Sequence, residues 1–238
     1  MSQRFYAPDL KVDQFSYILD PFESKHLVRV LRKKEGDRIE LGNGLGDLFE
    51  AIIIDANSKR CELAVQVHSR ESLPPFRIHL ALALLKSNDR FEWCLEKATE
   101  LGVASITPLL SDHCEKNKFN QERAERTLQS AFKQSLNAFI PELHPLQSVS
   151  DYLMAHDEET VLMGHCYEEP QKKDLFFTAR NYNDYHIMIG PEGDFSRNEV
   201  LLAKQQKAEF FSLGEQRLRT ETAAIVAINR ILCAQLSE

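Results

Sequence analysis

The sequence has few of the features that mark membrane proteins and disulfide-stabilised proteins. No uninterrupted apolar stretch reaches the roughly 20 residues that a membrane-spanning helix needs, and the opening residues, MSQRFYAPDL, contain no apolar signal-peptide core. The five cysteines include no Cys-x-x-Cys pair, and an odd number in 238 residues argues against a disulfide framework. We therefore expect a cytosolic protein with reduced thiols and without a membrane partner.

Metal ligands in paired clusters are also missing from the sequence. A histidine adjoins a cysteine at His113-Cys114 and at His165-Cys166. A structural zinc ion is usually held by four ligands in two close pairs, and neither place provides them. We therefore expect no metal site.

The chain as a whole has no excess of positive charge. The formal net charge is −7, which argues weakly against a nucleic-acid partner. Residues 25–38 (KHLVRVLRKKEGDR) depart from this balance, because they hold six basic and two acidic residues. A solvated helix face is the ordinary interpretation of such a run, and contact with nucleic-acid phosphates is the alternative.

The remaining composition, 43% hydrophobic and 27% charged, is that of a folded protein able to bury a core. Residues 1–72 contain short strand-like runs separated by turn-forming residues. The glycine-rich segment 41–47 (LGNGLGD) lies between two of these runs and precedes no helix, so we interpret it as a hairpin turn rather than a dinucleotide loop. A linker is predicted at 72–75 (SLPP). The strands predicted here are 37–41, 48–55 and 61–68.

Strands and helices alternate from residue 76 onward, which is the pattern of a mainly parallel sheet with helices on both faces. Asp89 and Asn120 are predicted to cap two of the helices, and Gly102 to end the first. Two further helices are predicted over 197–207 and 221–236. The predicted strands are 77–85, 105–110, 160–164, 185–190 and 209–213.

Unusual residues gather in loops that follow these strands, where open α/β sheets bind their ligands. Gly190-Pro191-Glu192-Gly193-Asp194-Phe195 precedes a capping box, Ser196–Glu199, and its glycines and proline predict a tight turn that a ligand can approach closely. Its two carboxylates favour a cationic or neutral ligand over phosphate. A plain structural turn is the alternative.

Two more loops complete this edge of the predicted sheet. Leu213–Thr222 (LGEQRLRTET) connects the last strand to the last helix, and Thr220 is predicted to cap that helix. For Arg217, a surface charge and a residue of the cleft are equal alternatives, whereas Arg219 is predicted to enter the cleft. The strand 160–164 ends at His165, for which packing is the alternative to ligand contact.

Several motifs in this order resemble one known family. They are the N-terminal RFY (4–6), HLVRVLRKKEGD (26–37), EKATELGVASITPL (96–109), IGPEGDFSRNE (189–199) and LGEQRLRTETA (213–223). Together they resemble the RsmE family of SPOUT-class RNA methyltransferases, which methylate N3 of a uridine in 16S ribosomal RNA. The similarity spans essentially the whole chain.

The resemblance implies a fold, a cofactor and partners. Residues 1–72 are expected to form a PUA-like RNA-binding β-barrel. Residues 76–238 are expected to form a SPOUT α/β domain with a mainly parallel sheet and a deep trefoil knot that binds S-adenosylmethionine. The implied partners are 16S rRNA or the small ribosomal subunit, and a second copy of the chain. The apolar face of the last helix is a candidate dimer interface (Ala224, Ile228, Ile231 and Leu232).

The resemblance and the chemistry of methyl transfer also suggest residue roles. Arg219 is the candidate that neutralises charge on the uracil, with Glu192 or Glu221 as the base. Phe5 or Tyr6 either stacks on a base or packs in the core. The candidate cofactor-binding residues are His165, Gly190, Pro191, Glu192, Gly193, Leu213, Gly214, Leu218 and Thr220. The candidate RNA-binding residues are Arg4, Lys25, His26, Arg29, Arg32 and Lys33.

Two other functions and three departures from the family pattern accompany this interpretation. In the first alternative function, the chain methylates another base or a ribose 2′-hydroxyl. In the second, it is a non-catalytic RNA-binding assembly factor. Asp194 replaces a usual glycine, which we expect it to tolerate because Asp adopts left-handed backbone angles more readily than most residues. His113 replaces a common arginine, and Leu136-Asn137 replaces a usual Gly-Arg.

Overall fold

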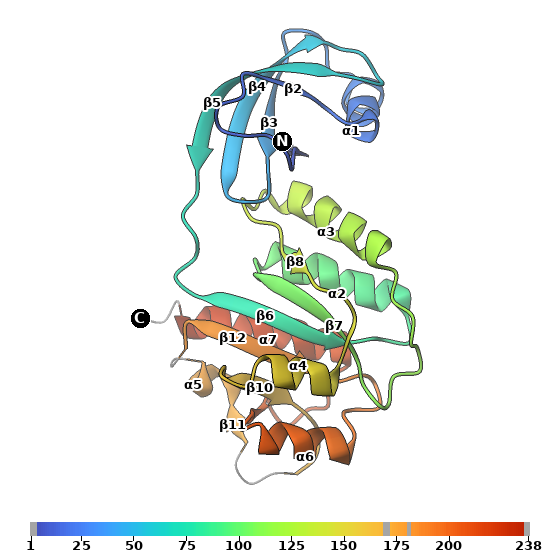
Figure 1. The fold of residues 1–238 in the computed structure, drawn as a ribbon, viewed down its shortest axis with the longest axis vertical. Coiled ribbons are helices and arrows are strands. Elements are labelled where there is room, and N and C mark those ends of the chain that lie inside the picture. The colour runs from blue at the N-terminus through green and yellow to red at the C-terminus, as the bar shows by residue number, and fades with distance from the viewer. Residues whose placement is uncertain (1–3, 169–171, 180–181, 236–238) are drawn as a thin grey trace. The chain divides into compact units, whose positions relative to one another are not determined.

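A computed structural model describes residues 4–168, 172–179 and 182–235 (Figure 1). It divides into two compact units, each with its own sheet. The first unit comprises Met1–Leu73 and Gln129–Ile140, and the second comprises Pro74–Leu128 and Pro141–Glu238. Gln129–Ile140, which the sequence analysis grouped with the second domain, therefore packs with the first unit.

The first unit contains a five-stranded half-barrel sheet with the order β1-β3-β4-β5-β2. Strand β1 pairs in parallel with β3, and the other pairs are antiparallel. Buried and more exposed residues alternate along much of β4, as expected for a sheet with one face on a core. The three strands predicted from the sequence correspond to β3, β4 and β5. The bounds are β1 (Arg4–Tyr6), β2 (Ser16–Ile18), β3 (Arg38–Gly42), β4 (Asp47–Asp55) and β5 (Glu62–Arg70).

The glycine-rich segment 41–47 forms the predicted hairpin turn. Gly42 pairs with Leu48 across the two strands, and the side chain of Asn43 accepts a hydrogen bond of 2.8 Å from the Leu45 N–H. Gly44 and Gly46 both have positive φ, which a glycine adopts without steric cost. The segment therefore closes a β-hairpin rather than opening a nucleotide-binding helix.

The basic run begins at the last residue of a short helix, α1 (Pro21–Lys25), and continues through a π-helical turn (His26–Val30). The Asp20 side chain caps α1 by accepting from the N–H groups of Phe22 and Glu23. Leu27 is buried beneath this run, which orients the neighbouring basic side chains outward.

The second unit contains an eight-stranded sheet with the order β11-β13-β10-β12-β6-β7-β8, and β9 also pairs with β7. Every strand pair described in it is parallel, as predicted. The bounds are β6 (Arg77–Ala83), β7 (Ser105–Leu110), β8 (Glu142–Leu143), β9 (Gln147–Ser148), β10 (Val161–Gly164), β11 (Lys173–Asp174), β12 (Asp184–Ile189) and β13 (Glu209–Ser212).

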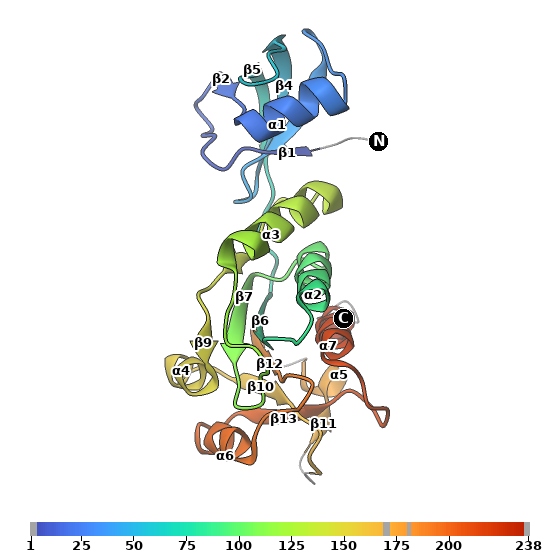
Figure 2. The ribbon, with the colours of Figure 1, turned by 90° about the vertical axis from the view of Figure 1, so that its right-hand side faces the viewer.

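Helices cover both faces of this sheet, which explains the continuous apolar sequence of β6 and β12. Figure 2 shows α4 and α6 on one side and α2, α5 and α7 on the other. Among the helices in the described ranges, none is both long and apolar enough to span a bilayer. The bounds are α2 (Asn88–Glu100), α3 (Gln121–Ser135), α4 (Val149–Ala155), α5 (Leu175–Thr178), α6 (Arg197–Gln205) and α7 (Thr220–Gln235).

The helix ends confirm some of the predicted caps and correct others. Asn120 caps α3, and Ser196 and Glu199 form the predicted capping box of α6. Helix α2 is capped by Ser87 and not by Asp89, which lies inside its first turn. Helix α7 already begins at Thr220, so Thr220 is not the cap.

The apolar face of α7 packs inside its own unit. Ala224, Ile228 and Ile231 are fully buried in the single chain, because α7 packs against α2, α5 and the sheet. The expectation that these three residues lie in a dimer interface was therefore wrong. The trefoil knot stays a prediction.

Candidate functional site

Three neighbouring strands bring the three candidate loops to one edge of the second unit. Strand β10 lies between β13 and β12, and Gly164 at its end is in register with both Phe211 and Ile189. All three strands are parallel, so the segments that follow them leave from the same edge. This edge therefore carries the loops that begin at His165, Gly190 and Leu213.

The loop from Gly190 to Phe195 is fixed by hydrogen bonds from Asp194. Asp194 has φ +65°, the left-handed conformation that we expected it to tolerate in place of glycine. Its carboxylate accepts from the N–H groups of Phe195 and Cys166, both at 2.8 Å. These bonds join the loop to the segment that follows β10. Gly190 and Pro191 are buried, whereas Glu192 and Gly193 are exposed.

His113 braces the same loop from the connection after β7. Its Nδ1 lies 3.0 Å from the carbonyl oxygens of Gly193 and Asp194. A Cβ at Gly193 would lie 3.0 Å from the Cβ of His113, which is tighter than ordinary packing allows. The absence of a side chain at Gly193 therefore permits this close approach, a role for His113 that sequence reasoning missed.

Glu192 connects the loop to the end of β6. Its carboxylate oxygens lie 3.2 and 3.4 Å from the backbone nitrogen of Lys86, which donates to them. The Lys86 ammonium group pairs with Glu115 instead, at 3.0 Å. Glu192 is thus a solvent-accessible carboxylate held by a backbone N–H.

The loop after β13 presents two leucines and an exposed arginine. Leu213 and Leu218 are half-buried, and Arg219 is exposed directly before α7. Gly214 has φ +121°, and the position of a Cβ there is in open space. Arg230 of α7 donates to the carbonyl of Leu213 at 3.3 Å and anchors the start of the loop.

The first turn of α7 is buried and contains the second candidate carboxylate. Thr220 and Glu221 are both less than a tenth exposed. One carboxylate oxygen of Glu221 lies 3.7 Å from Nε of Arg90 on α2, and the other has no hydrogen-bond partner among the described residues. Glu192 and Glu221 therefore differ in environment, because Glu192 is open to solvent and Glu221 is enclosed beside a guanidinium.

His165 is buried, and its ring participates in packing. The ring meets Phe210 of β13 edge-on at 4.7 Å and also lies near Tyr167. Its carbonyl oxygen accepts from the Lys172 ammonium group at 2.6 Å. The ring therefore packs within the second unit, and contact of His165 with a ligand stays a prediction.

The candidate RNA-binding residues separate into two groups. Arg4 is 7% exposed, and its guanidinium donates to the carbonyls of Leu136 and Asn137 inside the first unit. The expectation that Arg4 contacts an RNA phosphate was therefore wrong. Phe5 belongs to the core, as the second alternative had it. Exposed or half-buried basic side chains remain on the basic run, beside a hollow of about 480 Å³ that Arg32, Lys33 and Lys34 help to line. They are Lys25, His26, Arg29, Arg32 and Lys33.

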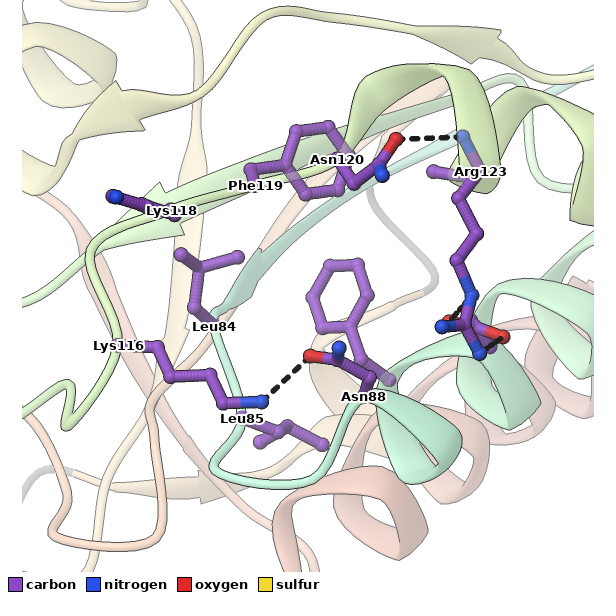
Figure 3. Close-up of a pocket in the computed structure, with 11 residues that line it drawn as sticks. Leu84, Leu85, Asn88, Lys116, Lys118, Phe119, Asn120 and Arg123 are labelled. Atoms are coloured by element: carbon purple, nitrogen blue, oxygen red, sulfur yellow. Dashed lines mark hydrogen bonds and ion pairs between the residues drawn. The ribbon is translucent and has the colours of Figure 1, made fainter.

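A cavity of about 240 Å³ lies beside the N-terminal end of α2 (Figure 3). Leu84 and Leu85 follow β6 and line one side, and the connection between β7 and α3 supplies Lys116, Lys118 and Phe119. This cavity could not be predicted from the sequence, because its walls come from segments that have no shared motif.

A polar cluster lies at the opposite, amino edge of the sheet. One oxygen of Glu159 lies 2.6 Å from Nδ1 of His156 and 2.7 Å from Nε2 of His186. The three ligand atoms are close enough for a metal ion. Because the carboxylate already accepts from both rings, we interpret the group as a hydrogen-bonded cluster. Tyr152 completes it at 3.2 Å from Nδ1 of His186, and the ring of His79 stacks on His186 at 4.5 Å.

Burial controls protonation in this cluster. Desolvation lowers the pKa of His186 to about 4, and the neighbouring His79 acts in the same direction against the attraction of Glu159. Burial also lowers the pKa of His79. Both rings are therefore neutral at neutral pH.

Comparison with known proteins identifies both units. Residues 72–232 match the model of an RNA methyltransferase domain, and residues 19–66 match that of an RNA methyltransferase PUA domain. The ribosomal RNA small subunit methyltransferase E of Rickettsia conorii is 31% identical over 209 residues, covering 87% of this chain and 85% of that protein.

Solved structures resemble the chain over its whole length. A probable rRNA-methyltransferase from Porphyromonas gingivalis is 36% identical with a TM-score of 0.88, covering 98% of each chain. The ribosomal RNA small subunit methyltransferase E of Neisseria gonorrhoeae, crystallised with S-adenosyl methionine, is 26% identical with a TM-score of 0.84 and covers 100% of this chain and 98% of that one. The chain therefore belongs to the ribosomal RNA small subunit methyltransferase E family of RNA methyltransferases.

Proposed function

We propose that the protein transfers a methyl group from S-adenosylmethionine to N3 of a uridine in the 16S rRNA of the small ribosomal subunit. The observation that carries this proposal is the full-length similarity to a family member crystallised with S-adenosyl methionine. The gathering of three loops at one edge of the sheet supports it independently.

The residues at this edge fit an adenosyl group. Gly193 and Gly214 are exposed and have no side chains, so a ligand can approach their backbone groups closely. The half-buried Leu213 and Leu218 offer apolar contact to a purine ring. Backbone groups of the loops after β10, β12 and β13 would hold the cofactor. The residues involved are His165, Gly190, Pro191, Glu192, Gly193, Leu213, Gly214, Leu218 and Thr220.

Residues of the protein have to accept one proton from the uracil and stabilise one developing negative charge on it. Bound S-adenosylmethionine supplies an electrophilic methyl group on a sulfonium. The bond from sulfur to the methyl carbon breaks as N3 of the uracil forms its bond to that carbon, and the N3 proton passes to a carboxylate. Arg219 stabilises the negative charge on the uracil oxygens. Glu192 and Glu221 are the two candidate bases.

Methyl incorporation into rRNA from a strain that lacks the gene tests this proposal. The purified protein is expected to transfer labelled methyl groups to that rRNA, and nucleoside analysis is expected to yield N3-methyluridine. A methylated ribose or another methylated base would support the first alternative. RNA binding without any transfer would support a non-catalytic assembly factor.

Separate substitutions of the two carboxylates identify the base. Glu192→Gln and Glu221→Gln keep the size of each side chain and remove its capacity to accept the proton. The base variant is expected to lose about 10²–10⁴-fold in the rate of transfer. Unchanged rates in both variants would remove carboxylate catalysis from the mechanism.

The basic run of the first unit supplies the RNA contacts of this proposal. Lys25, Arg29 and Arg32 are exposed, and the described part of the chain shows no ion pair for any of them. Charge reversal at Arg32 and Lys33 is expected to weaken RNA binding and to flatten its dependence on salt, because fewer counterions are released. Identical salt slopes in both proteins would contradict the assignment.

The proposed enzyme acts in the cytoplasm, where ribosomal subunits are assembled, as a homodimer formed through its second unit. Trp93 on α2 is 43% exposed and Leu232 on α7 is half-buried, so each of these two neighbouring helices leaves some apolar surface uncovered. Light scattering on the purified protein is expected to give twice the mass of the chain. A Trp93→Glu variant is expected to shift that value toward one chain.

A further inference from the structure

The cavity beside α2 contains none of the residues assigned to the methyl donor or to catalysis. Its lining nevertheless combines cations, an accessible aromatic ring and amide groups (Figure 3). We propose that this cavity binds one unpaired nucleotide of the RNA substrate that flanks the methylated uridine. The inference rests on the proposed function and adds a binding site for the substrate strand.

The charge of the lining favours an anion. Arg123 is paired with Glu92 at 2.6 Å, so its charge is largely compensated. Lys116 donates to the neutral Oδ1 of Asn88 at 2.6 Å and, within the described residues, forms no pair with a carboxylate. Figure 3 shows Lys118 extending outward from the rim. Two uncompensated lysines at one cavity suit the phosphates on either side of a bound nucleotide.

The cavity also provides a surface on which a base can stack. Phe119 is half-buried, and its ring meets the buried Phe91 edge-on at 5.9 Å. Phe91 therefore fixes one edge of the Phe119 ring and leaves part of that ring accessible. An unpaired base gains much of its affinity for a protein from stacking on such a ring.

The amide side chains differ in their availability. Asn120 uses its Oδ1 to cap α3 through the N–H of Arg123. Asn88 accepts from Lys116, and its amide NH₂ stays able to donate to a base carbonyl. The lining thus offers a hydrogen-bond donor, a stacking surface and two cations to one ligand.

The volume and the position of the cavity favour a nucleotide that flanks the methylated uridine as its ligand. The volume of about 240 Å³ is below the roughly 300–1,000 Å³ of typical drug-sized sites, so it suits a single nucleotide better than the whole methyl donor. Leu84 and Leu85 of the wall directly precede Lys86, whose N–H donates to Glu192 of the glycine loop. The wall of the cavity is therefore continuous in sequence with a residue that contacts the loop assigned to the donor, which favours a nucleotide close to the methylated uridine in the strand.

Binding and steady-state measurements on two variants of the full chain test this inference. Phe119→Ala and Lys116→Ala are each expected to weaken binding of 16S rRNA about tenfold, the scale of one lost stack or phosphate contact. The KM for RNA is expected to rise by a similar factor while kcat changes little. Calorimetry is expected to give the same affinity for S-adenosylmethionine as in the wild type. Phe119→Trp is expected to restore RNA binding, because indole also stacks on a base.

Matched controls and the wild type separate the possible failures. Phe177→Ala removes an exposed phenylalanine outside the cavity, and Lys59→Ala removes an exposed lysine outside it. Both variants are expected to bind RNA as the wild type does. Wild-type RNA affinity and KM in Phe119→Ala and Lys116→Ala would overturn the inference. If Phe119→Ala fails to fold, Lys116→Ala and Phe119→Trp decide the question. Absence of methyl transfer by the wild type would instead overturn the proposed function.

Discussion

The two edges of the parallel sheet in the second unit differ in how their polar groups are used. At the carboxyl edge, glycines and exposed charges such as Glu192 and Arg219 leave backbone and side-chain groups accessible. At the amino edge, Glu159, His186 and Tyr152 hydrogen-bond to one another. The polar groups at the carboxyl edge are therefore accessible to a ligand, whereas those at the amino edge already form hydrogen bonds with other side chains. We call the carboxyl edge the open edge and the amino edge the closed edge.

Removal of Arg219 is expected to have a large effect at the open edge, of the same order as removal of the base. Arg219→Ala should reduce methyl transfer about 10²–10³-fold, because a positioned donor to a developing oxyanion is lost. The side chain is exposed, so the fold should be unaffected. Single-turnover rates on rRNA measure the effect. Arg217→Ala, an exposed arginine in the same loop, is the matched control and should retain the wild-type rate.

Acidification is expected to destabilise the protein through His186 at the closed edge. The pKa of His186 is about 4 in the folded protein, below the value of about 6.5 for an unperturbed histidine. The unfolded chain therefore binds a proton first as the pH falls, and the stability that His186 contributes above about pH 6.5 is progressively lost down to about pH 4. The free energy of unfolding should fall by up to about 3 kcal/mol over this window.

Urea denaturation across that pH range measures the loss. His186→Gln removes the titrating ring and should give a flatter pH dependence. The same slope in the variant and the wild type would assign the pH dependence to other groups.

Substitution of Gly193 tests the open edge through geometry rather than charge. The side chain in Gly193→Val would collide with His113, whose Cβ lies 3.0 Å from the position of the new Cβ. A displaced loop should weaken S-adenosylmethionine binding about 10²-fold, the cost of misplacing a binding element by about 1 Å. Calorimetry measures the affinity. Partial recovery in Gly193→Val combined with His113→Gly, which removes the colliding Cβ, would confirm that the collision is the cause.

The smallest effect is expected from Tyr152 at the closed edge. With Nε2 of His186 donating to Glu159, the Tyr152 hydroxyl donates to Nδ1. Tyr152→Phe should cost about 1 kcal/mol of stability, the typical value of one hydrogen bond. Thermal unfolding measures this loss. The affinity for S-adenosylmethionine should not change, and a change would show that the two edges are coupled.

Features that depend on neighbouring residues could be predicted from the sequence. The capping box of Ser196 and Glu199, the left-handed backbone at Asp194 and the hairpin at 41–47 all follow from local residue preferences. The strand and helix alternation predicted the parallel sheet for the same reason. These signals also indicated which loops follow the strands of the sheet, whereas the spatial order of those strands comes from the structure.

Features that depend on distant residues could not be predicted in this way. Arg4 is occupied by the carbonyls of Leu136 and Asn137, more than 130 positions away, and no local pattern shows such a partner. The buried face of α7 has the same apolar pattern whether the chain itself or a second copy covers it. The cavity at Phe119 likewise needs two segments that only the tertiary fold brings together.

The pairing of β6 with β12 has a consequence for protein synthesis. These central strands join residues 107 positions apart, such as Arg77 and Asp184. The ribosome must therefore make more than three quarters of the chain before the middle of the sheet can close, and long-range pairing of this kind slows folding. We expect nascent chains that end before α7 to lack a methyl-donor site, because the loop after β13 and the first turn of α7 are then missing.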